Sequence, residues 1–199
     1  MTAIVPNRGR GRPRGFDPDK GIETAQQLFQ ERGYDGVGVA DICRALGITP
    51  PSFYNAYASK AALFDRVLDR YGASFGRFVP DALMREADIV TAIERVLTDA
   101  ARLYAAKDGV AGCLVLDGTR GSGDAEARAL TARRMDESQE MIATRIAEEF
   151  PGRAEELASI VVIALKGLSA AAHDGASADA LSAFARVAAE GFKMALRRG

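Results

Sequence analysis

Apolar residues recur at intervals of three and four along most of this chain, which is the spacing of one face of an α-helix. Residues 153–173 differ, because positions 159–165 are almost continuously apolar, and a helix of that kind must be buried on several sides. The pattern predicts an all-α protein. The striped segments are residues 17–33, 89–104, 126–150 and 177–196.

A tighter pattern near the N-terminus predicts a helix-turn-helix. A first short helix ends at Gly47, because a residue without Cβ accepts the left-handed conformation of a sharp turn. Pro50 and Pro51 open a second helix, in whose first turn a missing N–H is tolerated. Phe53 and Tyr57 are four residues apart and can pack beneath that helix. In such a motif the second helix enters the DNA major groove.

The segment that follows is expected to connect this motif to the rest of the chain. Ser59 can cap a helix in which apolar residues recur from Leu63 to Phe78, over about five turns. Pro80 is expected to end or bend that helix. Further along, residues 112–119 are expected to form a short helix and residues 118–124 a glycine-rich loop.

Three segments, LFQERGY, GITPPSFYNAY and SKAALF, resemble the amino-terminal domain of TetR-family transcriptional regulators, over roughly residues 18–79. The remainder resembles that family only in length and helical character. The resemblance implies an N-terminal three-helix helix-turn-helix domain joined by a long helix to a helical domain for ligand binding and dimerisation. The expected division is a flexible basic arm at 1–16, the DNA-binding domain at 17–79 and the effector-binding and dimerisation domain at 80–199.

Matching the family pattern also assigns roles in DNA binding. Asn55 suits adenine, because a side-chain amide forms paired hydrogen bonds with that base. Two departures, at Val37-Gly38 and at Ala56, remove a helix cap and phosphate contacts that the family usually has. The phosphate-binding candidates are Thr49, Ser52, Tyr54 and Lys60, the base-contacting candidates are Pro50, Pro51 and Asn55, and Tyr57 completes the set.

Charge is distributed unevenly, although the formal net charge is only −1. Residues 1–60 carry 8 Lys or Arg against 6 Asp or Glu, a balance of +2, and the remainder carries 18 against 21, a balance of −3. Arg10, Arg12 and Arg14 lie among glycines and a proline that prevent a helix. We expect these arginines to reach DNA phosphates or the minor groove, and the alternative is a solvated tail that aids solubility.

The last two predicted helices have wide apolar faces and many small residues, which suit close packing against the same pair in a second subunit. The alternative is that both complete the core of a single chain. The resemblance to the TetR family implies a four-helix dimer bundle and favours a homodimer. The expected interface residues are Val161, Leu165, Leu168, Leu181, Phe184 and Phe192.

Aromatic, methionine and cysteine side chains are the candidates for an effector pocket. Such residues at helical spacing are more often part of a plain core. Cys113 can sense oxidants or electrophiles only if its pKa is depressed, and no basic residue adjoins it in sequence, which favours a packed thiol. The candidates are Phe75, Phe78, Tyr104, Cys113, Met135 and Met141.

The residue types do not support catalysis, a metal site or a cofactor. His173 is the only histidine, and Cys43 and Cys113 are far apart, so neither a paired nucleophile nor a metal-ligand set can be recognised. The glycines of residues 118–124 lack a lysine–hydroxyl pair and follow no strand, which argues against nucleotide binding. No apolar run approaches about 18 residues and the N-terminus has no apolar signal core, so we expect a cytoplasmic protein without a membrane contact.

The favoured interpretation is a homodimeric transcriptional regulator. It would be a repressor that an unknown small-molecule effector releases from a palindromic operator in double-stranded DNA. One alternative is a helical small-molecule-binding protein or enzyme without specific DNA binding. Another is an architectural DNA-binding protein without an effector.

Overall fold

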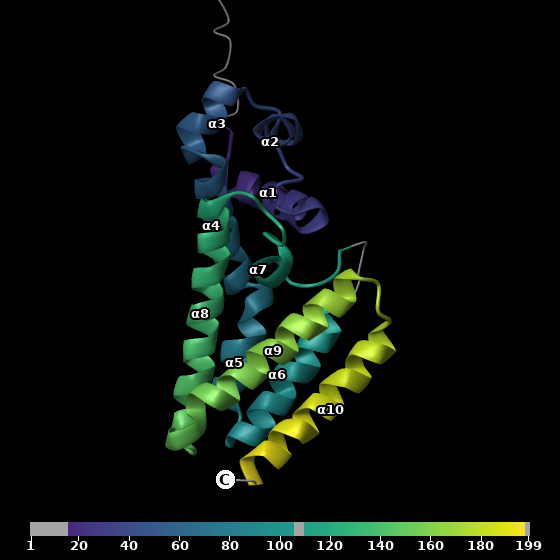
Figure 1. Ribbon diagram of the computed structural model, residues 1–199. Coiled ribbons are helices and arrows are strands. Elements are labelled where there is room, and N and C mark those ends of the chain that lie inside the picture. Colours follow the sequence, from purple (N-terminus) through teal and green to yellow (C-terminus); the bar gives the residue numbers. More distant parts are fainter. Residues whose placement is uncertain (1–15, 106–109, 198–199) are drawn as a thin grey trace, which may run out of the picture.

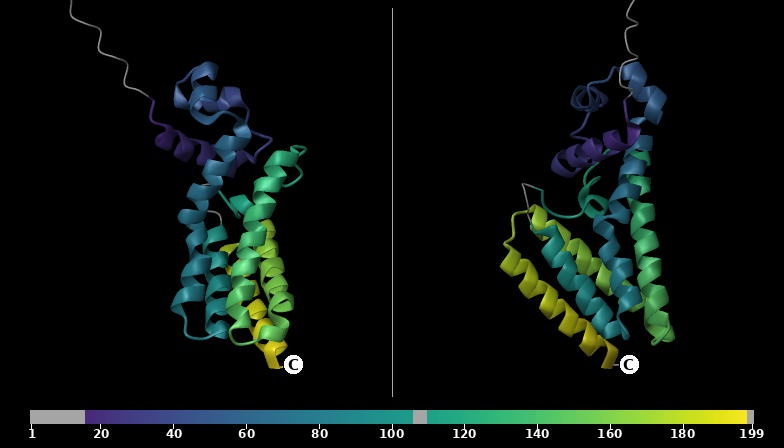
Figure 2. Two further views of the ribbon diagram at one scale, coloured as in Figure 1. Left: turned by 90° about the vertical axis from the view of Figure 1, so that its left-hand side faces the viewer. Right: turned by 180° about the vertical axis from the view of Figure 1, so that it is seen from behind.

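The computed structural model describes residues 16–105 and 110–197, which contain ten α-helices and two short 3-10 helices. This confirms the all-α fold (Figure 1). Helices α1 to α3 lie at one end of the molecule, and α4 and α8 run side by side away from that end (Figures 1 and 2). The elements are α1 (Pro18–Arg32), α2 (Val39–Leu46), α3 (Pro50–Tyr57), α4 (Lys60–Ala73), η1 (Phe75–Arg77), α5 (Phe78–Arg85), α6 (Ile89–Tyr104), α7 (Leu114–Asp117), α8 (Ala125–Ala147), η2 (Pro151–Arg153), α9 (Ala154–His173) and α10 (Ala178–Arg197).

The N-terminal helices begin and end at the residues that were predicted to cap them. The carboxylate of Asp17 accepts a hydrogen bond from the Asp19 N–H at 3.1 Å, and the Ser59 hydroxyl accepts one from the Ala62 N–H at 2.9 Å. Gly47, with φ 64° and ψ 32°, ends α2 in the left-handed conformation. Local chemistry therefore sets the bounds of these helices.

An aromatic cluster holds α1 to α3 against α4. The ring of Tyr34 stacks on Phe29 with centroids 5.8 Å apart, and Phe64 of α4 packs edge-on against Phe29 at 5.0 Å. These three side chains are buried, as are Phe53 and Tyr57 of α3. The N-terminal unit therefore shares its core with the first turns of α4.

The prediction of one continuous helix from Leu63 to Phe78 is wrong. Helix α4 ends at Ala73, a single 3-10 turn follows, and α5 begins at Phe78. Pro80 lies in the first turn of α5, where a backbone N–H has no acceptor within the helix, so the N–H that proline lacks is not missed. In an unbroken helix its ring would clash with the carbonyl four residues earlier, so the break precedes the proline. The expected domain boundary at 79–80 falls inside α5 and stays a prediction.

Smaller differences lie around α7. This helix covers only four of the eight residues predicted as helical in segment 112–119. Gly112 adopts φ 80°, which an α-helix cannot contain, and residues 118–119 form a turn. Residues 118–124 form a loop as predicted, and α6 has the predicted bounds. The expected helix end at residues 108–109 lies outside the described residues.

Helix α9 is the most apolar helix and packs against α6, α8 and α10 (Figure 2). By length and composition alone, Pro151–His173 is able to cross a membrane, but 50% of its most apolar window is buried inside the chain. The core helix of a soluble protein has the same properties. The prediction that this helix is buried on several sides is therefore confirmed.

A close approach in the N-terminal unit provides a test of stability. A Cβ at Gly21 would lie 2.0 Å from the Tyr57 hydroxyl and 2.7 Å from the Phe16 ring. Gly21→Ala should therefore lower the free energy of unfolding by about 1–3 kcal/mol through overpacking. Gly72 on α4 is the matched control, because a Cβ there meets no atom within 4 Å, and Gly72→Ala should be neutral or stabilising by up to about 1 kcal/mol. Urea unfolding of both variants measures the difference, and equal stabilities would contradict the packing argument.

Candidate DNA-binding surface and ligand cavity

Helix α3 presents most of the predicted DNA-binding residues to solvent, at the upper end of the molecule in Figure 1. The Thr49 hydroxyl caps this helix by accepting a hydrogen bond from the Ser52 N–H at 3.4 Å, and the two hydroxyl oxygens lie 3.0 Å apart. Tyr54 is the large aromatic side chain on this surface, with 52% of its surface exposed. The exposed members of the predicted set are Thr49, Pro50, Pro51, Ser52, Tyr54 and Asn55.

Tyr57 does not belong to this surface, so its inclusion among the DNA-binding residues is wrong. Its side chain is 1% exposed, and its hydroxyl donates a hydrogen bond to the Pro18 carbonyl at 2.8 Å. Its ring packs against Phe53 and edge-on against Phe16. The spacing of four residues from Phe53 places Tyr57 beneath α3, where it holds this helix against the start of α1.

Lys60 is occupied within the chain. Its ammonium donates hydrogen bonds to the carbonyls of Tyr34 at 3.1 Å and Val37 at 3.2 Å, and it lies 3.8 Å from the centroid of the Tyr34 ring. An ammonium has three N–H donors, and two of them are used here. Lys60 therefore stabilises the turn between α1 and α2, and its contact with a phosphate stays a prediction.

Val37 and Gly38, which depart from the family pattern just before α2, are stabilised by other contacts. Val37 is fully buried, and the Gly38 N–H donates a hydrogen bond to the Asp41 carboxylate at 3.0 Å. This bond and the Arg44 guanidinium lower the pKa of Asp41, because both favour the charged carboxylate. Arg44 was missing from the predicted set, although its side chain is 77% exposed on α2. In a helix-turn-helix the first helix crosses the DNA backbone, so the sequence could have predicted that a basic residue on the outer face of this helix contacts phosphate.

A cavity of about 210 Å³ lies among α4, α5, α7, α8 and α9. Phe75 does not line it: this side chain is 49% exposed, and its ring stacks on Tyr71 with centroids 5.6 Å apart. The prediction for Phe75 is wrong because it assumed an unbroken helix, whereas the break after α4 turns this residue outward. The prediction also missed Leu68, Tyr71 and Gly72 of α4, which line the cavity. The predicted residues that do line it are Phe78, Tyr104, Cys113, Met135 and Met141.

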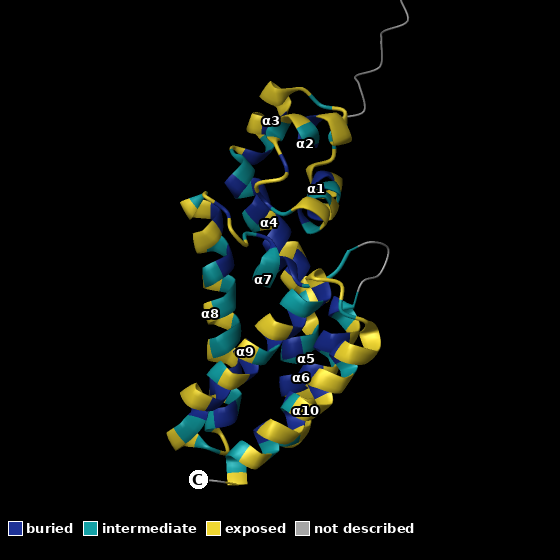
Figure 3. Cartoon of the chain, turned by 45° about the vertical axis from the view of Figure 1, so that its right-hand side comes forward, coloured by how far each residue is buried: buried dark blue, intermediate teal, exposed yellow. Residues whose placement is uncertain are grey.

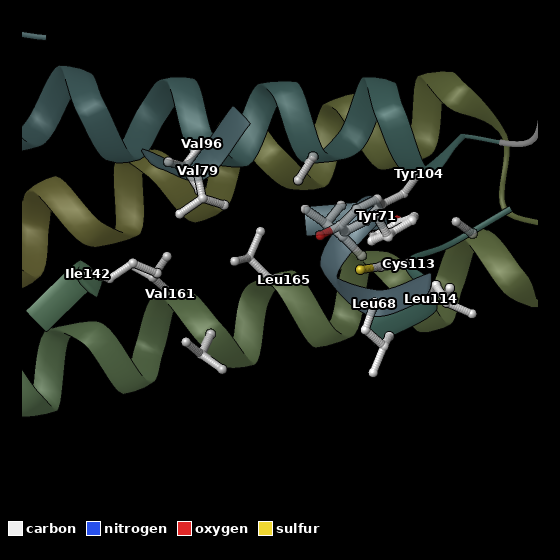
Figure 4. Close-up of a cluster of buried hydrophobic side chains, with 14 of the residues drawn as sticks. Leu68, Tyr71, Val79, Val96, Tyr104, Cys113, Leu114, Ile142, Val161 and Leu165 are labelled. Carbon is white, nitrogen blue, oxygen red and sulfur yellow. The ribbon is translucent and has the colours of Figure 1, made fainter. Parts of the chain in front are cut away.

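Cys113, Tyr71 and Tyr104 lie close together (Figure 4), and all three line this cavity. Burial raises the pKa of the Cys113 thiol, and a hydrogen bond from Tyr71 offsets that effect only in part. Burial also raises the pKa of Tyr71 and of Tyr104 well above the ordinary value. The three groups are therefore uncharged at neutral pH, and the thiol is not activated as a nucleophile.

The charged rim of the cavity is internally paired. Arg134 lines the cavity, and its guanidinium lies 3.0 Å from Asp65 and also pairs with Asp69 on α4. The same guanidinium lies 3.6 Å from Glu137, one turn further along α8. The positive charge of Arg134 is therefore already neutralised, and an anionic ligand would have to displace these carboxylates.

The six predicted dimer residues divide into two groups. Five of them are at most 6% exposed, and the prediction that they form an interface is wrong, because the inward faces of α9 and α10 pack on α6 and on each other. These five are Val161, Leu165, Leu168, Leu181 and Phe192. Parts of α9 and α10 are exposed (Figure 3), and the 47% exposed Phe184 is one of five exposed large apolar side chains on these two helices, which we call the outward stripe. The stripe consists of Ile160, Ile163, Phe184, Val187 and Met194.

The structure does not test the remaining predictions from the sequence. Arg10, Arg12 and Arg14 lie outside the described residues, so the contact of the arm with DNA stays a prediction. Within residues 16–105 and 110–197 no group of three or more His, Cys, Asp or Glu side chains is arranged to hold a metal ion. Cys43 and Cys113 are both buried and free.

Known proteins resemble this chain over nearly its whole length. A family model described as bacterial regulatory proteins, tetR family, matches residues 22–67. The HTH-type transcriptional repressor BdcR of Escherichia coli (strain K12) is 38% identical over 196 residues, which are 98% of this chain and 99% of BdcR. The repressor ComR of the same organism is 29% identical, with 87% of this chain and 88% of ComR aligned. A cysteine mutant of the TetR family transcriptional regulator CifR, complexed with 26-base-pair double-strand operator DNA, has a TM-score of 0.81 and 29% identity, and the match covers 90% of this chain and 98% of that one.

The buried thiol provides a pH-dependent test. Because the pKa of Cys113 is raised, its alkylation by iodoacetamide should be slow at pH 7 and should accelerate only above the pH at which a free cysteine titrates. Peptide mass spectrometry distinguishes Cys113 from Cys43, and the protein unfolded in urea serves as the control. If the native protein reacts at pH 7 as fast as the unfolded protein, Cys113 is an activated thiol instead.

Proposed function

Since this chain belongs to the TetR family of bacterial regulatory proteins and is a DNA-binding transcriptional repressor, we propose that it acts as a homodimer on a palindromic operator and that a small-molecule effector releases it. It is a regulator and not an enzyme. BdcR and ComR are named repressors, and CifR has been solved on double-strand operator DNA. The protein is soluble, and a cytoplasmic location is part of the proposal because the operator is DNA.

The observation that carries the proposal is the exposed outer face of α3, together with the cap at its N-terminus. Its outward side chains combine a hydroxyl pair at Thr49 and Ser52 with the Asn55 amide and the Tyr54 phenol. Hydroxyls suit phosphate oxygens, and an amide suits the edge of an adenine base. The two kinds of group on one helix match the double task of positioning and reading DNA.

The homodimer is supported by the outward stripe on α9 and α10. Ile163 and Val187 are 67% and 71% exposed, and Gly167 and Gly191, which are also exposed, allow the helices of two subunits to approach closely. A contiguous exposed apolar patch is typical of a protein–protein interface. Joined there, two copies would have to place their α3 helices about 34 Å apart to meet successive major grooves.

The cavity supports an effector that is small, uncharged and mostly apolar. Its volume of about 210 Å³ is below the roughly 300–1,000 Å³ of common ligand pockets. The charge of Arg134 at the edge of the cavity is neutralised by Asp65. Tyr71 and Tyr104 offer only uncharged hydroxyl groups. An effector in this cavity would push on α4, which leads directly into α3. Release requires that the effector bind the DNA-free arrangement more tightly than the DNA-bound one.

The proposed division of labour on α3 is tested with two variants. Asn55→Ala should relax preference at one symmetric pair of operator positions, because a bidentate base contact supplies about 1–3 kcal/mol of discrimination. Tyr54→Phe should weaken binding to all sequences by a similar factor, because a phosphate contact carries no sequence information. The measurement is a titration of each protein against single-base operator variants at fixed salt.

The matched control is the wild-type protein on the same panel, together with unrelated DNA of equal length. Uniform weakening by Asn55→Ala would assign that residue to the backbone and leave base contacts to Pro50 and Pro51. If the wild-type protein binds operator and unrelated DNA with equal affinity, the proposed function is wrong.

The proposed interface is tested at the outward stripe. Phe184→Glu should give monomers and abolish operator binding, because the buried charge would have no partner and one half-site offers too few contacts. Phe184 is half exposed in the single chain, so the monomer should keep its fold and its circular dichroism spectrum. Arg186→Glu, which changes an exposed charge on the same helix outside the stripe, is the control and should remain dimeric. Sedimentation velocity measures both, and an intact Phe184→Glu dimer would place the interface elsewhere.

A further inference from the structure

Two phenol groups and a thiol lie close together on the wall of the 210 Å³ cavity (Figure 4). Tyr71 belongs to α4, Tyr104 ends α6 and Cys113 precedes α7, and each of the three is at most 8% exposed. The hydroxyls of both tyrosines donate hydrogen bonds to the Cys113 sulfur. The cavity wall therefore carries two O–H donors that share one acceptor, and we call Tyr71 and Tyr104 the phenol pair.

The acceptor that the phenol pair shares is a poor one. A thiol sulfur accepts hydrogen bonds only weakly, whereas a buried O–H group costs free energy when its partner is weak or missing. An oxygen atom of a bound molecule would be a better acceptor. Each phenol O–H rotates about its C–O bond, so it can turn from the sulfur toward such an oxygen while its ring stays in place.

Backbone hydrogen bonds hold this group of residues in position. The Cys113 N–H donates to the Ser169 hydroxyl of α9 at 2.7 Å, which fixes the start of α7 against α9. The Leu114 N–H donates to the hydroxyl oxygen of Tyr71. The positions of the donors are therefore set before any ligand enters, which lowers the entropy that binding must cost.

The other polar groups of the cavity wall are already paired. The Ser138 hydroxyl donates to the Arg134 carbonyl at 2.9 Å, and the Arg134 guanidinium lies 3.6 Å from the Glu137 carboxylate. All remaining side chains that line the cavity, among the residues that the structure describes, are apolar or belong to glycine. A ligand thus meets an apolar wall with one pair of hydrogen-bond donors, and such isolated polar groups fix the orientation of a ligand.

We propose that Tyr71 and Tyr104 select an effector that carries a carbonyl oxygen on an otherwise apolar skeleton, and that both hydroxyls donate to this oxygen. This inference rests on the proposed effector site and names the chemical class of its ligand. A carbonyl oxygen has two lone pairs and accepts from both donors at once. A carboxylate is disfavoured, because a buried charge needs an opposite charge and Arg134 is already paired.

The test uses two small molecules that differ in one group. Cyclohexanone carries a carbonyl, and methylenecyclohexane has nearly the same shape with a CH₂ group in place of the oxygen. Each is titrated into the full-length protein, and the NMR signals of the Met135 and Met141 methyl groups, which line the cavity, report binding. The quantity compared is the ratio of the two affinities in each variant, because the different hydration of the two molecules cancels when variants are compared.

We expect Tyr71→Phe and Tyr104→Phe each to weaken cyclohexanone binding about fivefold, because each removes one hydrogen bond to the carbonyl. Both should leave methylenecyclohexane binding within about twofold of the wild type, because it accepts no hydrogen bond. Ser138→Ala is the matched control, since it removes a hydroxyl of the cavity wall that is already bonded, and it should leave the affinity ratio unchanged.

Two outcomes of this titration would overturn the proposal. If the tyrosine variants change the binding of both molecules equally, the phenol pair only fills space. If cyclohexanone at saturating concentration shifts neither methionine signal, the cavity does not accept a carbonyl compound.

A further variant separates the phenol pair from the thiol. Cys113→Ala removes the acceptor that competes for the two O–H groups, so the affinity ratio should shift further toward cyclohexanone. A shift toward methylenecyclohexane would show that the sulfur itself binds the carbonyl group, and it would overturn the assignment to Tyr71 and Tyr104.

Operator binding is measured separately, with and without cyclohexanone, so that the two proposals can fail independently. If the phenol pair binds cyclohexanone selectively and operator affinity is unchanged, the phenol pair stands and release by this ketone fails. If cyclohexanone weakens operator binding while the tyrosine variants do not change the affinity ratio, the phenol pair is overturned and the proposed function stands.

Discussion

The arrangement of this protein depends on the burial of one tyrosine side chain. Tyr34 joins the N-terminal helices to α4 through its ring, which packs against both Phe29 and Phe64. A buried residue is stable only if its polar groups are paired, and here the N–H is bonded to Gly118 and the carbonyl to Lys60. The same residue that completes the hydrophobic core thus fixes the orientation of the DNA-binding unit relative to the C-terminal helices.

The interruption between α4 and α5 shapes the cavity. Pro80 excludes a continuous helix, and the Ser74 hydroxyl donates a hydrogen bond to the Arg70 carbonyl at 2.8 Å, which satisfies an acceptor at the helix end. The change of direction turns Phe78 toward the cavity and leaves Phe75 outside. One local break therefore determines which aromatic residues a ligand would meet.

The ion pairs between α8 and α4 contribute little to stability, but they join the two helices. Partly exposed ion pairs such as Arg133 with Asp65 are worth at most about 1 kcal/mol each. The pairs of Arg133 and Arg134 also join α8 to α4, and they neutralise Arg134, the only arginine among the described residues that lines the 210 Å³ cavity. The lining of the cavity is left mostly apolar, with uncharged polar groups at Cys113, Tyr71 and Tyr104, and this lining is the basis for proposing an uncharged effector.

The sequence by itself determined most of the helices, their caps and the helix-turn-helix, because signals such as Asp17, Gly47 and Ser59 act on backbone groups within four residues. The resemblance carried by the same region indicated the family. Only the tertiary structure decided between the two roles predicted for Tyr57, packing beneath α3 and contacting DNA. It also decided that the inner residues of α9 and α10 are core and that Lys60 holds a turn. The physical reason is that a helical pattern identifies an apolar face, while the partner that covers this face lies far away in sequence. Whether an apolar residue meets its own chain, a ligand or a second subunit is therefore settled by packing, not by periodicity.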